Sequence, residues 1–174
     1  YGTTTNHVLA LEMVLPDGSV KRFGNRLGEV PGFDLVGAIV GSEGTLGVVT
    51  EATVRLTPIP KAVETLLVLF DDVVGACRAV GRVIRSGVVP AALEIVDRRT
   101  IEAVEASVYA AGLPVTAGAV LIVELDGLPV ALAGEIEAIR AACAAERCQA
   151  IEIARDEAER KRFWRARKGA FGAM

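Results

Sequence analysis

The amino-acid sequence predicts an α+β protein in two parts that meet near residue 60. Before this position, short β-branched and aliphatic runs are separated by glycine-rich turns, a pattern typical of strands. After it, strand-like runs alternate with amphipathic helical patterns, as expected for a sheet layered by helices. Thr57-Pro58-Ile59-Pro60 lies between the two textures, and each proline disfavours a helical conformation of the residue before it. The sequence therefore predicts domains over residues 1–60 and 61–174.

The first part is predicted to consist mainly of strands. Val8–Leu15 and Ser19–Phe23 are expected to form a hairpin, because Pro16-Asp17-Gly18 combines a preset φ with a residue that accepts positive φ. Val48–Leu56 has the alternating character of a further strand. Phe33–Val40 is apolar, and its pattern leaves helix and strand open.

The second part is predicted to form a ferredoxin-like β-α-β-β-α-β domain with an extra helix, an antiparallel sheet and helices on one face. Strands are expected over Glu64–Phe70, Ala91–Val96, Ala119–Leu125 and Gln149–Ala154. Helices are expected from Asp71 or Asp72 to Gly87, from Asp97 to about Ala111, around Leu132–Cys143, and from Asp156 to about Ala170.

Composition argues against several classes of protein. Hydrophobic residues make up 52% of the chain, which is enough for a core, yet no apolar run approaches the ~20 residues that span a bilayer. The net charge of −3 argues against a nucleic-acid partner. Cys77, Cys143 and Cys148 are odd in number and lack CxxC spacing, which predicts small buried thiols in a reducing compartment, the cytoplasm.

A glycine-punctuated segment precedes the third predicted strand. Gly41-Ser-Glu-Gly-Thr-Leu-Gly47 has glycine at every third position, so its backbone can approach a ligand and expose N–H groups to it. The pattern matches neither the Rossmann fingerprint nor the P-loop. Spacing alone favours the simpler interpretation, a turn that leads into a strand.

Several segments resemble the flavoproteins of the vanillyl-alcohol-oxidase type, in their branch of glycolate oxidase flavin subunits and D-lactate and D-2-hydroxyglutarate dehydrogenases. Tyr1–Thr4, Val8–Gly18 and Gly41–Glu51 resemble the second half of the flavin-binding domain in that family. Pro90–Asp97 and Arg155–Arg160 resemble its C-terminal substrate domain. The resemblance covers essentially the whole chain in the right order.

This resemblance implies a partial FAD-binding α+β domain over residues 1–60 and a substrate domain, incomplete at its C-terminus, over residues 61–174. A carboxylate beside a diphosphate is unfavourable, so Glu43 is expected at a ribose hydroxyl, at a backbone N–H, or in a structural role. The residues that the resemblance implies at the FAD site are Tyr1, Gly2, Glu43, Gly44, Gly47 and Val48.

The resemblance places other functional groups outside the chain. The first diphosphate-binding loop of the family is expected before Tyr1. The histidines and the glutamate that the family uses for metal binding and proton abstraction are expected after Met174. A divalent metal is therefore expected only through residues outside this chain, and no catalytic residue is assigned within it. His7 is the single histidine, and neither its spacing nor its position in the family makes it the base.

The last predicted helix carries the candidate substrate-binding residue. Trp164, Arg167 and Phe171 occur at i, i+3 and i+7, which places a guanidinium on one stripe with two aromatic rings. From the residues alone, Arg167 either binds a carboxylate at the edge of a pocket or extends to solvent. Trp164-x-x-Arg167 resembles the family's Trp-x-x-Arg motif, whose arginine binds the carboxylate of a 2-hydroxy acid. Lys168 is expected at the surface.

Two predicted strands carry glutamates on one face of the sheet. Glu94 alternates with Leu93 and Ile95, and Glu124 alternates with Val123 and Leu125. Alternation favours a solvated face for these carboxylates. The other interpretation is an open face turned toward flavin or substrate.

The resemblance implies an FAD-dependent oxidase or dehydrogenase. Hydride would pass from C2 of a small 2-hydroxy acid to the flavin, Arg167 would bind the carboxylate, and a histidine outside the chain would take the hydroxyl proton. Electron-transfer subunits are candidate partners. Two alternatives stay open, an FAD-dependent alcohol oxidase or ether-lipid synthase of the same superfamily, and a non-catalytic ferredoxin-like ligand-binding module.

We expect the 174-residue chain alone to bind FAD weakly or not at all. Affinity that depends on N–H groups converging from two loops falls steeply when one loop is absent. Titration of FAD followed by flavin fluorescence tests this expectation. Micromolar binding by the 174 residues would contradict it.

Overall fold

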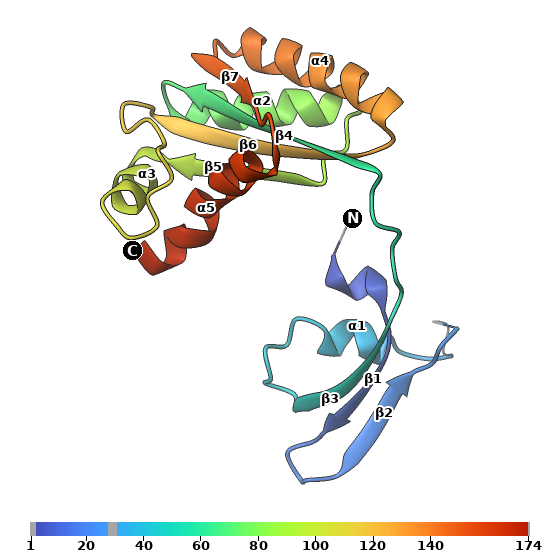
Figure 1. Cartoon of the computed structure of the whole chain (residues 1–174). Coiled ribbons are helices and arrows are strands. Elements are labelled where there is room, and N and C mark those ends of the chain that lie inside the picture. The colour runs from blue at the N-terminus through green and yellow to red at the C-terminus, as the bar shows by residue number, and fades with distance from the viewer. Residues whose placement is uncertain (1–2, 28–30, 174) are drawn as a thin grey trace. The chain divides into compact units, whose positions relative to one another are not determined.

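The computed structural model describes residues 3–27 and 31–173. The chain divides into two compact units, Tyr1–Ile59 and Pro60–Met174, and Figure 1 shows the elements of each.

The first unit is a three-stranded antiparallel sheet with one short helix. Strands β1 (Val8–Val14), β2 (Val20–Gly24) and β3 (Val48–Val54) lie in the order β2-β1-β3, after a 3₁₀ turn η1 (Thr4–His7). The predicted hairpin is therefore β1 and β2. The segment whose type the sequence left open contains helix α1 (Leu35–Ile39).

Helix α1 begins at Asp34, whose carboxylate accepts a hydrogen bond from the Gly37 N–H at 2.8 Å. Such a cap satisfies one of the N–H groups that a helix start leaves unpaired. Val36 and Ile39 of α1 pack on Leu11 and Met13 of β1, which makes a small core on one face of the sheet.

The second unit has the predicted ferredoxin-like topology. Its strands are β4 (Ala62–Phe70), β5 (Ala92–Asp97), β6 (Ala119–Gly127) and β7 (Ala150–Ile153). They lie in the order β5-β6-β4-β7, and every neighbouring pair is antiparallel. The two central strands, β4 and β6, are therefore the first and third strands of the β-α-β-β-α-β plan.

Helices cover both faces of this sheet, so the prediction of helices on one face is wrong. The crossover helices α2 (Val73–Arg85) and α4 (Pro129–Ala145) pack on one face. Helices α3 (Arg98–Glu105) and α5 (Glu157–Ala173) pack on the other. The physical reason lies in β4 and β6, in which successive residues are apolar. Because side chains along a strand alternate between the two faces of the sheet, both faces are apolar and must be covered.

Gly118 lies where two backbones approach each other closely. Its N–H donates to the Phe70 carbonyl at 2.9 Å, and a Cβ at this position would overlap the Asp71 carbonyl oxygen. Only glycine fits without a shift of the chain. Gly134 is a suitable contrast, because it lies on α4 and a Cβ there would meet open space.

We expect Gly118→Ala to lower the free energy of unfolding by about 3 kcal/mol, because the added methyl must displace backbone. Gly134→Ala should change it by at most about 1 kcal/mol, in the stabilising direction, because alanine favours the helix. Urea denaturation of the two variants and the parent measures both. Equal stability of the two variants would contradict the close approach at Gly118.

Candidate functional site

The glycine loop, residues Gly41–Gly47, joins α1 to β3 and borders a cavity of about 350 Å³. Gly41 and Gly44 have φ of 89° and 81°, and a side chain at either would extend into open space. Glu43 also has positive φ, 50°, which non-glycine residues seldom adopt. Within residues 3–27 and 31–173, the N–H groups of Glu43 and Gly44 have no hydrogen-bond acceptor. Unpaired N–H groups beside a cavity can donate hydrogen bonds to an anionic ligand.

The other residues predicted at the FAD site have different positions. Gly47 lies against β1, where a Cβ would overlap the Val14 carbonyl oxygen and the Met13 methyl, so this glycine is required by packing. Val48 begins β3 with an exposed side chain and borders the same cavity as Glu43 and Gly44.

The remaining assignments at this site are not tested by the structure. Tyr1 and Gly2 lie outside the described residues. The Glu43 carboxylate has no ion-pair partner among the described residues, so its ribose or structural role stays a prediction.

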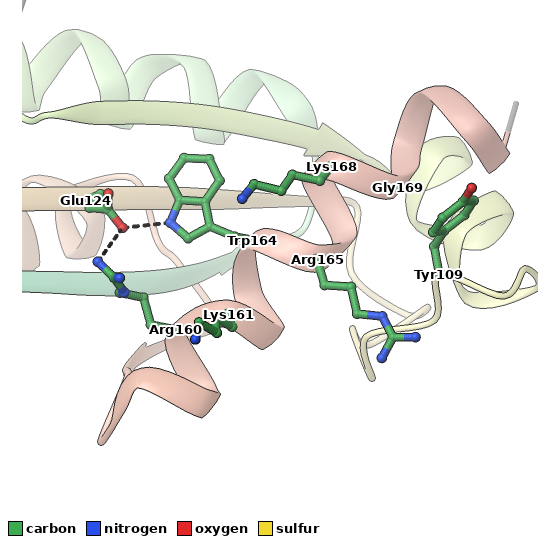
Figure 2. A pocket seen from close by; sticks show the side chains of 8 residues that line it. All are labelled: Tyr109, Glu124, Arg160, Lys161, Trp164, Arg165, Lys168 and Gly169. Atoms are coloured by element: carbon green, nitrogen blue, oxygen red, sulfur yellow. Dashed lines mark hydrogen bonds and ion pairs between the residues drawn. The ribbon is translucent and has the colours of Figure 1, made fainter.

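Glu124 on β6 fixes the position of Trp164 on α5. Its Oε2 accepts hydrogen bonds from the Trp164 indole Nε1 at 2.7 Å and from the Thr65 hydroxyl at 2.9 Å. The Arg160 guanidinium lies 3.9 Å from the same oxygen. Figure 2 shows the indole and the guanidinium converging on this carboxylate. Because Thr65 is buried in β4 and paired with Glu124 in the sheet register, the acceptor is held by two strands.

Arg167 makes the corresponding contact with β5. Its Nε donates to Glu94 Oε2 at 2.8 Å, and its side chain is 45% exposed. The two terminal nitrogens of the guanidinium have no hydrogen-bond partner among the described residues. The terminal edge of the guanidinium is thus available to a ligand while its Nε is occupied.

The face that carries Glu94 and Glu124 is covered by α5, so the solvated face favoured by alternation is wrong. The two carboxylates lie on the same face because Ala92 of β5 pairs with Glu124 and Glu94 pairs with Ile122. Both accept hydrogen bonds from α5, Glu124 from the Trp164 indole and Glu94 from the Arg167 guanidinium.

The buried stripe of α5 differs from the predicted one. Phe163, Ala166 and Ala170 are buried against the sheet, whereas Phe171 is 90% exposed. Trp164 is only partly buried and lies at the margin of this stripe. Phe163, Ala166 and Ala170 also occur at i, i+3 and i+7, and this pattern in the sequence indicates the stripe that is buried. The prediction followed the larger aromatic residues Trp164 and Phe171 instead.

Beside Trp164 lies a cavity of about 740 Å³, shown in Figure 2. Lys168, which was expected only at the surface, lines it and has no ion-pair partner among the described residues. Tyr109 lies at the far side, against Gly169, where a Cβ would overlap the Tyr109 side chain. The residues that line the cavity are Tyr109, Glu124, Arg160, Lys161, Trp164, Arg165, Lys168 and Gly169.

The loop that carries Tyr109 begins earlier than predicted, since α3 ends at Glu105 and not near Ala111. The Glu105 carboxylate accepts three backbone hydrogen bonds, from the N–H groups of Ala111, Gly112 and Leu113, at 3.0, 3.1 and 2.9 Å. These N–H groups would otherwise lack the acceptors that a helix provides. Although burial by itself raises the pKa of the Glu105 carboxyl, the three donors hold that pKa below its ordinary value.

Other reactive groups do not form a centre in the described part of the chain. No group of three or more His, Cys, Asp or Glu side chains there could hold a metal ion. Burial, together with the neighbouring Cys148, raises the pKa of the Cys143 thiol to about 12. Cys148 is half-buried and Cys77 is exposed, so the expectation of buried thiols fails for Cys77. In the same residues, no helix is long and apolar enough to cross a membrane.

The second unit, a four-stranded ferredoxin-like sheet with helices on both faces, has the fold predicted for the substrate domain of an FAD-linked oxidase. Residues 59–174 match the family of FAD linked oxidases, C-terminal domain, and the chain belongs to this family. The family predicted from the resemblance, and the cofactor FAD that accompanies it, are thereby confirmed.

Relatives and one solved structure extend this finding. The chain is 41% identical over 174 residues to the glycolate oxidase subunit GlcD of Escherichia coli (strain K12), covering all of this chain and 35% of GlcD. It is 30% identical over 176 residues to the mitochondrial D-lactate dehydrogenase (cytochrome) 1 of Saccharomyces cerevisiae, covering 100% of this chain and 30% of the yeast protein. The structure of an alkyldihydroxyacetonephosphate synthase matches with a TM-score of 0.68 at 21% identity, covering 95% of this chain and 33% of the synthase chain. The chain thus spans about a third of the length of these proteins.

We expect Glu105→Gln to lower the free energy of unfolding at neutral pH by about 1 kcal/mol, because a neutral amide accepts the three N–H groups less strongly. Glu102→Gln is the matched control, since this glutamate is exposed on the same helix and its side chain makes no hydrogen bond or ion pair with described residues.

The same pair of variants has a distinct pH dependence. The folded pKa of Glu105 is lowered, so its stabilisation is present above the ordinary value of 4.5 and is lost as pH falls through the folded value. The difference in free energy of unfolding between parent and Glu105→Gln should therefore shrink as the pH falls from 4.5 through the folded pKa of Glu105. A difference that stays constant from pH 7 to acid would contradict the role of the carboxylate.

Proposed function

We propose that the chain is part of an FAD-dependent oxidoreductase that transfers hydride from C2 of a small 2-hydroxy acid, of the glycolate or D-lactate type, to the flavin. The observation that carries this proposal is the free terminal edge of the Arg167 guanidinium on a helix fixed to the sheet. Two relatives that align over the whole chain are named for oxidation of glycolate and of D-lactate, which supports the same substrate class.

Arg167 suits a carboxylate for geometric and electrostatic reasons. A guanidinium is planar and permanently charged, and two of its N–H groups match the two oxygens of a carboxylate in parallel hydrogen bonds. With Nε bound to Glu94, the terminal pair is the edge that can bind in this way. The neighbouring Trp164, held by Glu124, limits the movement of the helix turn from which Arg167 projects.

The first unit contributes to the cofactor site in this proposal. FAD, when bound, supplies the hydride acceptor. The N–H groups of Glu43 and Gly44 would donate to its diphosphate, and Gly41 and Gly44 keep the approach free of side chains. Val48 would contact the adenosine half from the start of β3. This division of roles follows the domains predicted over residues 1–60 and 61–174.

Several parts of the proposal concern groups outside the described residues. The base that takes the hydroxyl proton, and any divalent metal, are assigned to histidines and a glutamate beyond the chain. Electron-transfer subunits are proposed as partners, consistent with a relative that is named as a subunit. A cytoplasmic location is proposed from the three free cysteines.

The test uses Arg167→Ala in the full-length protein, with Arg82→Ala as a matched control. Arg82 is 47% exposed and also pairs with a glutamate, Glu146, but it does so on the opposite face of the sheet. We expect Arg167→Ala to raise KM for glycolate or D-lactate by about 10- to 100-fold, since a charge-assisted pair is worth about 1.5–3 kcal/mol. Flavin content and the absorbance spectrum should not change.

Two comparisons make the test specific for a carboxylate. Arg167→Lys should recover part of the loss, because a point charge replaces the charge but not the two-pronged geometry. A neutral primary alcohol, if oxidised at all, should be unaffected by either substitution. Flavin reduction by the 2-hydroxy acid at the parent rate in Arg167→Ala, at every concentration, would contradict the proposal and favour the alcohol oxidase.

A further inference from the structure

We infer that Glu94 is a positioning residue that sets the orientation of the Arg167 guanidinium for carboxylate binding. This inference rests on the proposed function, because it assumes that Arg167 contacts the substrate. Glu94 itself would not contact the substrate. Its effect would be to decide which edge of the guanidinium is presented, and in which plane.

The hydrogen bond between the two residues leaves the binding edge free. Glu94 Oε2 accepts from Nε of Arg167 at 2.8 Å, and the terminal nitrogens have no partner among the described residues. An arginine side chain is long and flexible, so it loses conformational entropy when it is fixed. A hydrogen bond that orders the side chain before the substrate binds reduces the entropy that is lost on binding.

The acceptor is held firmly enough to serve as a reference point. Glu94 lies within β5, which pairs with β6 from Ala92 to Asp97. Although β5 is the edge strand of the sheet, a side chain on a strand is placed more precisely than one on a loop. Arg167 has a longer side chain, and its hydrogen bond to Glu94 sets the direction of its guanidinium.

The helix does not depend on Glu94 for its place on the sheet. Phe163, Ala166 and Ala170 bury the apolar side of α5, and the Trp164 indole is bound to Glu124. The Glu94–Arg167 pair is partly exposed, with side chains 34% and 45% accessible, so its own contribution to stability is small. Loss of Glu94 should therefore affect the guanidinium more than the fold.

The carboxylate of Glu94 also has an opposing effect, because its negative charge weakens the attraction of Arg167 for an anion. Solvent screening reduces this effect for partly exposed groups. Charge and position thus predict opposite results when Glu94 is changed. If position dominates, a shorter carboxylate weakens substrate binding; if charge dominates, a neutral side chain of the same length strengthens it.

The experiment compares Glu94→Asp and Glu94→Gln in the full-length protein. Asp keeps the charge but is one methylene shorter, whereas Gln keeps the length and an oxygen that accepts from Nε. We expect Glu94→Asp to raise KM for glycolate or D-lactate about tenfold with kcat nearly unchanged, because binding is lost equally in ground and transition states. Glu94→Gln should raise KM by less than about threefold.

A second measurement avoids turnover. Acetate carries the carboxylate without the hydroxyl, so its inhibition constant should rise in parallel with KM in Glu94→Asp. Glu146→Asp is the control, because it shortens the carboxylate of a comparable ion pair with Arg82 on the other face. Melting temperature and flavin content of both Asp variants should match the parent.

The outcomes separate this inference from the proposed function. A rise in KM in Glu94→Asp that vanishes in the Arg167→Ala background supports the inference, since the effect then acts through the guanidinium. If Arg167→Ala weakens substrate binding and Glu94→Asp does not, or if Glu94→Gln binds acetate more tightly than the parent, the positioning role alone is overturned. If Arg167→Ala has no effect, both are overturned.

Discussion

The second unit depends on the burial of α5 against a sheet that is apolar on both faces. Strands β4 and β6 carry buried residues at successive positions, so a ferredoxin-like sheet covered only by α2 and α4 would expose one apolar face. Phe163, Ala166 and Ala170 of α5 join α3 in one core cluster over that second face. The positions of Trp164 and Arg167 follow from this packing.

Covering this face required partners for its polar groups. Glu94 and Glu124 lose part of their hydration under α5, with side chains that remain 34% and 20% exposed, and a partly desolvated carboxylate is stabilised by a hydrogen-bond donor. The helix supplies an indole N–H to one and a guanidinium to the other. Arg167 is therefore found in an ion pair because the sheet presents a carboxylate to this part of α5.

Much of this arrangement could be predicted from the sequence, because it depends on local patterns. The hairpin before β3, the strands of the second unit and the crossover helices follow from turn residues and periodicity. The early end of α3 could not be predicted, since Glu105 caps backbone groups six to eight residues ahead. The partners of Glu94 could not be predicted either, because the helix that supplies them is 73 residues away.

The charges on α5 show why geometry, more than net charge, determines what this helix can bind. Glu124, Glu157 and Glu94 pair with Arg160, Lys161 and Arg167. Other cations of the helix, Arg162 and Arg165, reach Glu159 and the Val108 carbonyl. Arg165 and Lys168, which both line the cavity beside Trp164, have no carboxylate partner among the described residues. Because exposed charges are screened within about 8 Å at physiological salt, an anion has to approach a cation of the helix closely to be held. In the proposed function, selectivity for a carboxylate then depends on how the guanidinium edge of Arg167 is oriented.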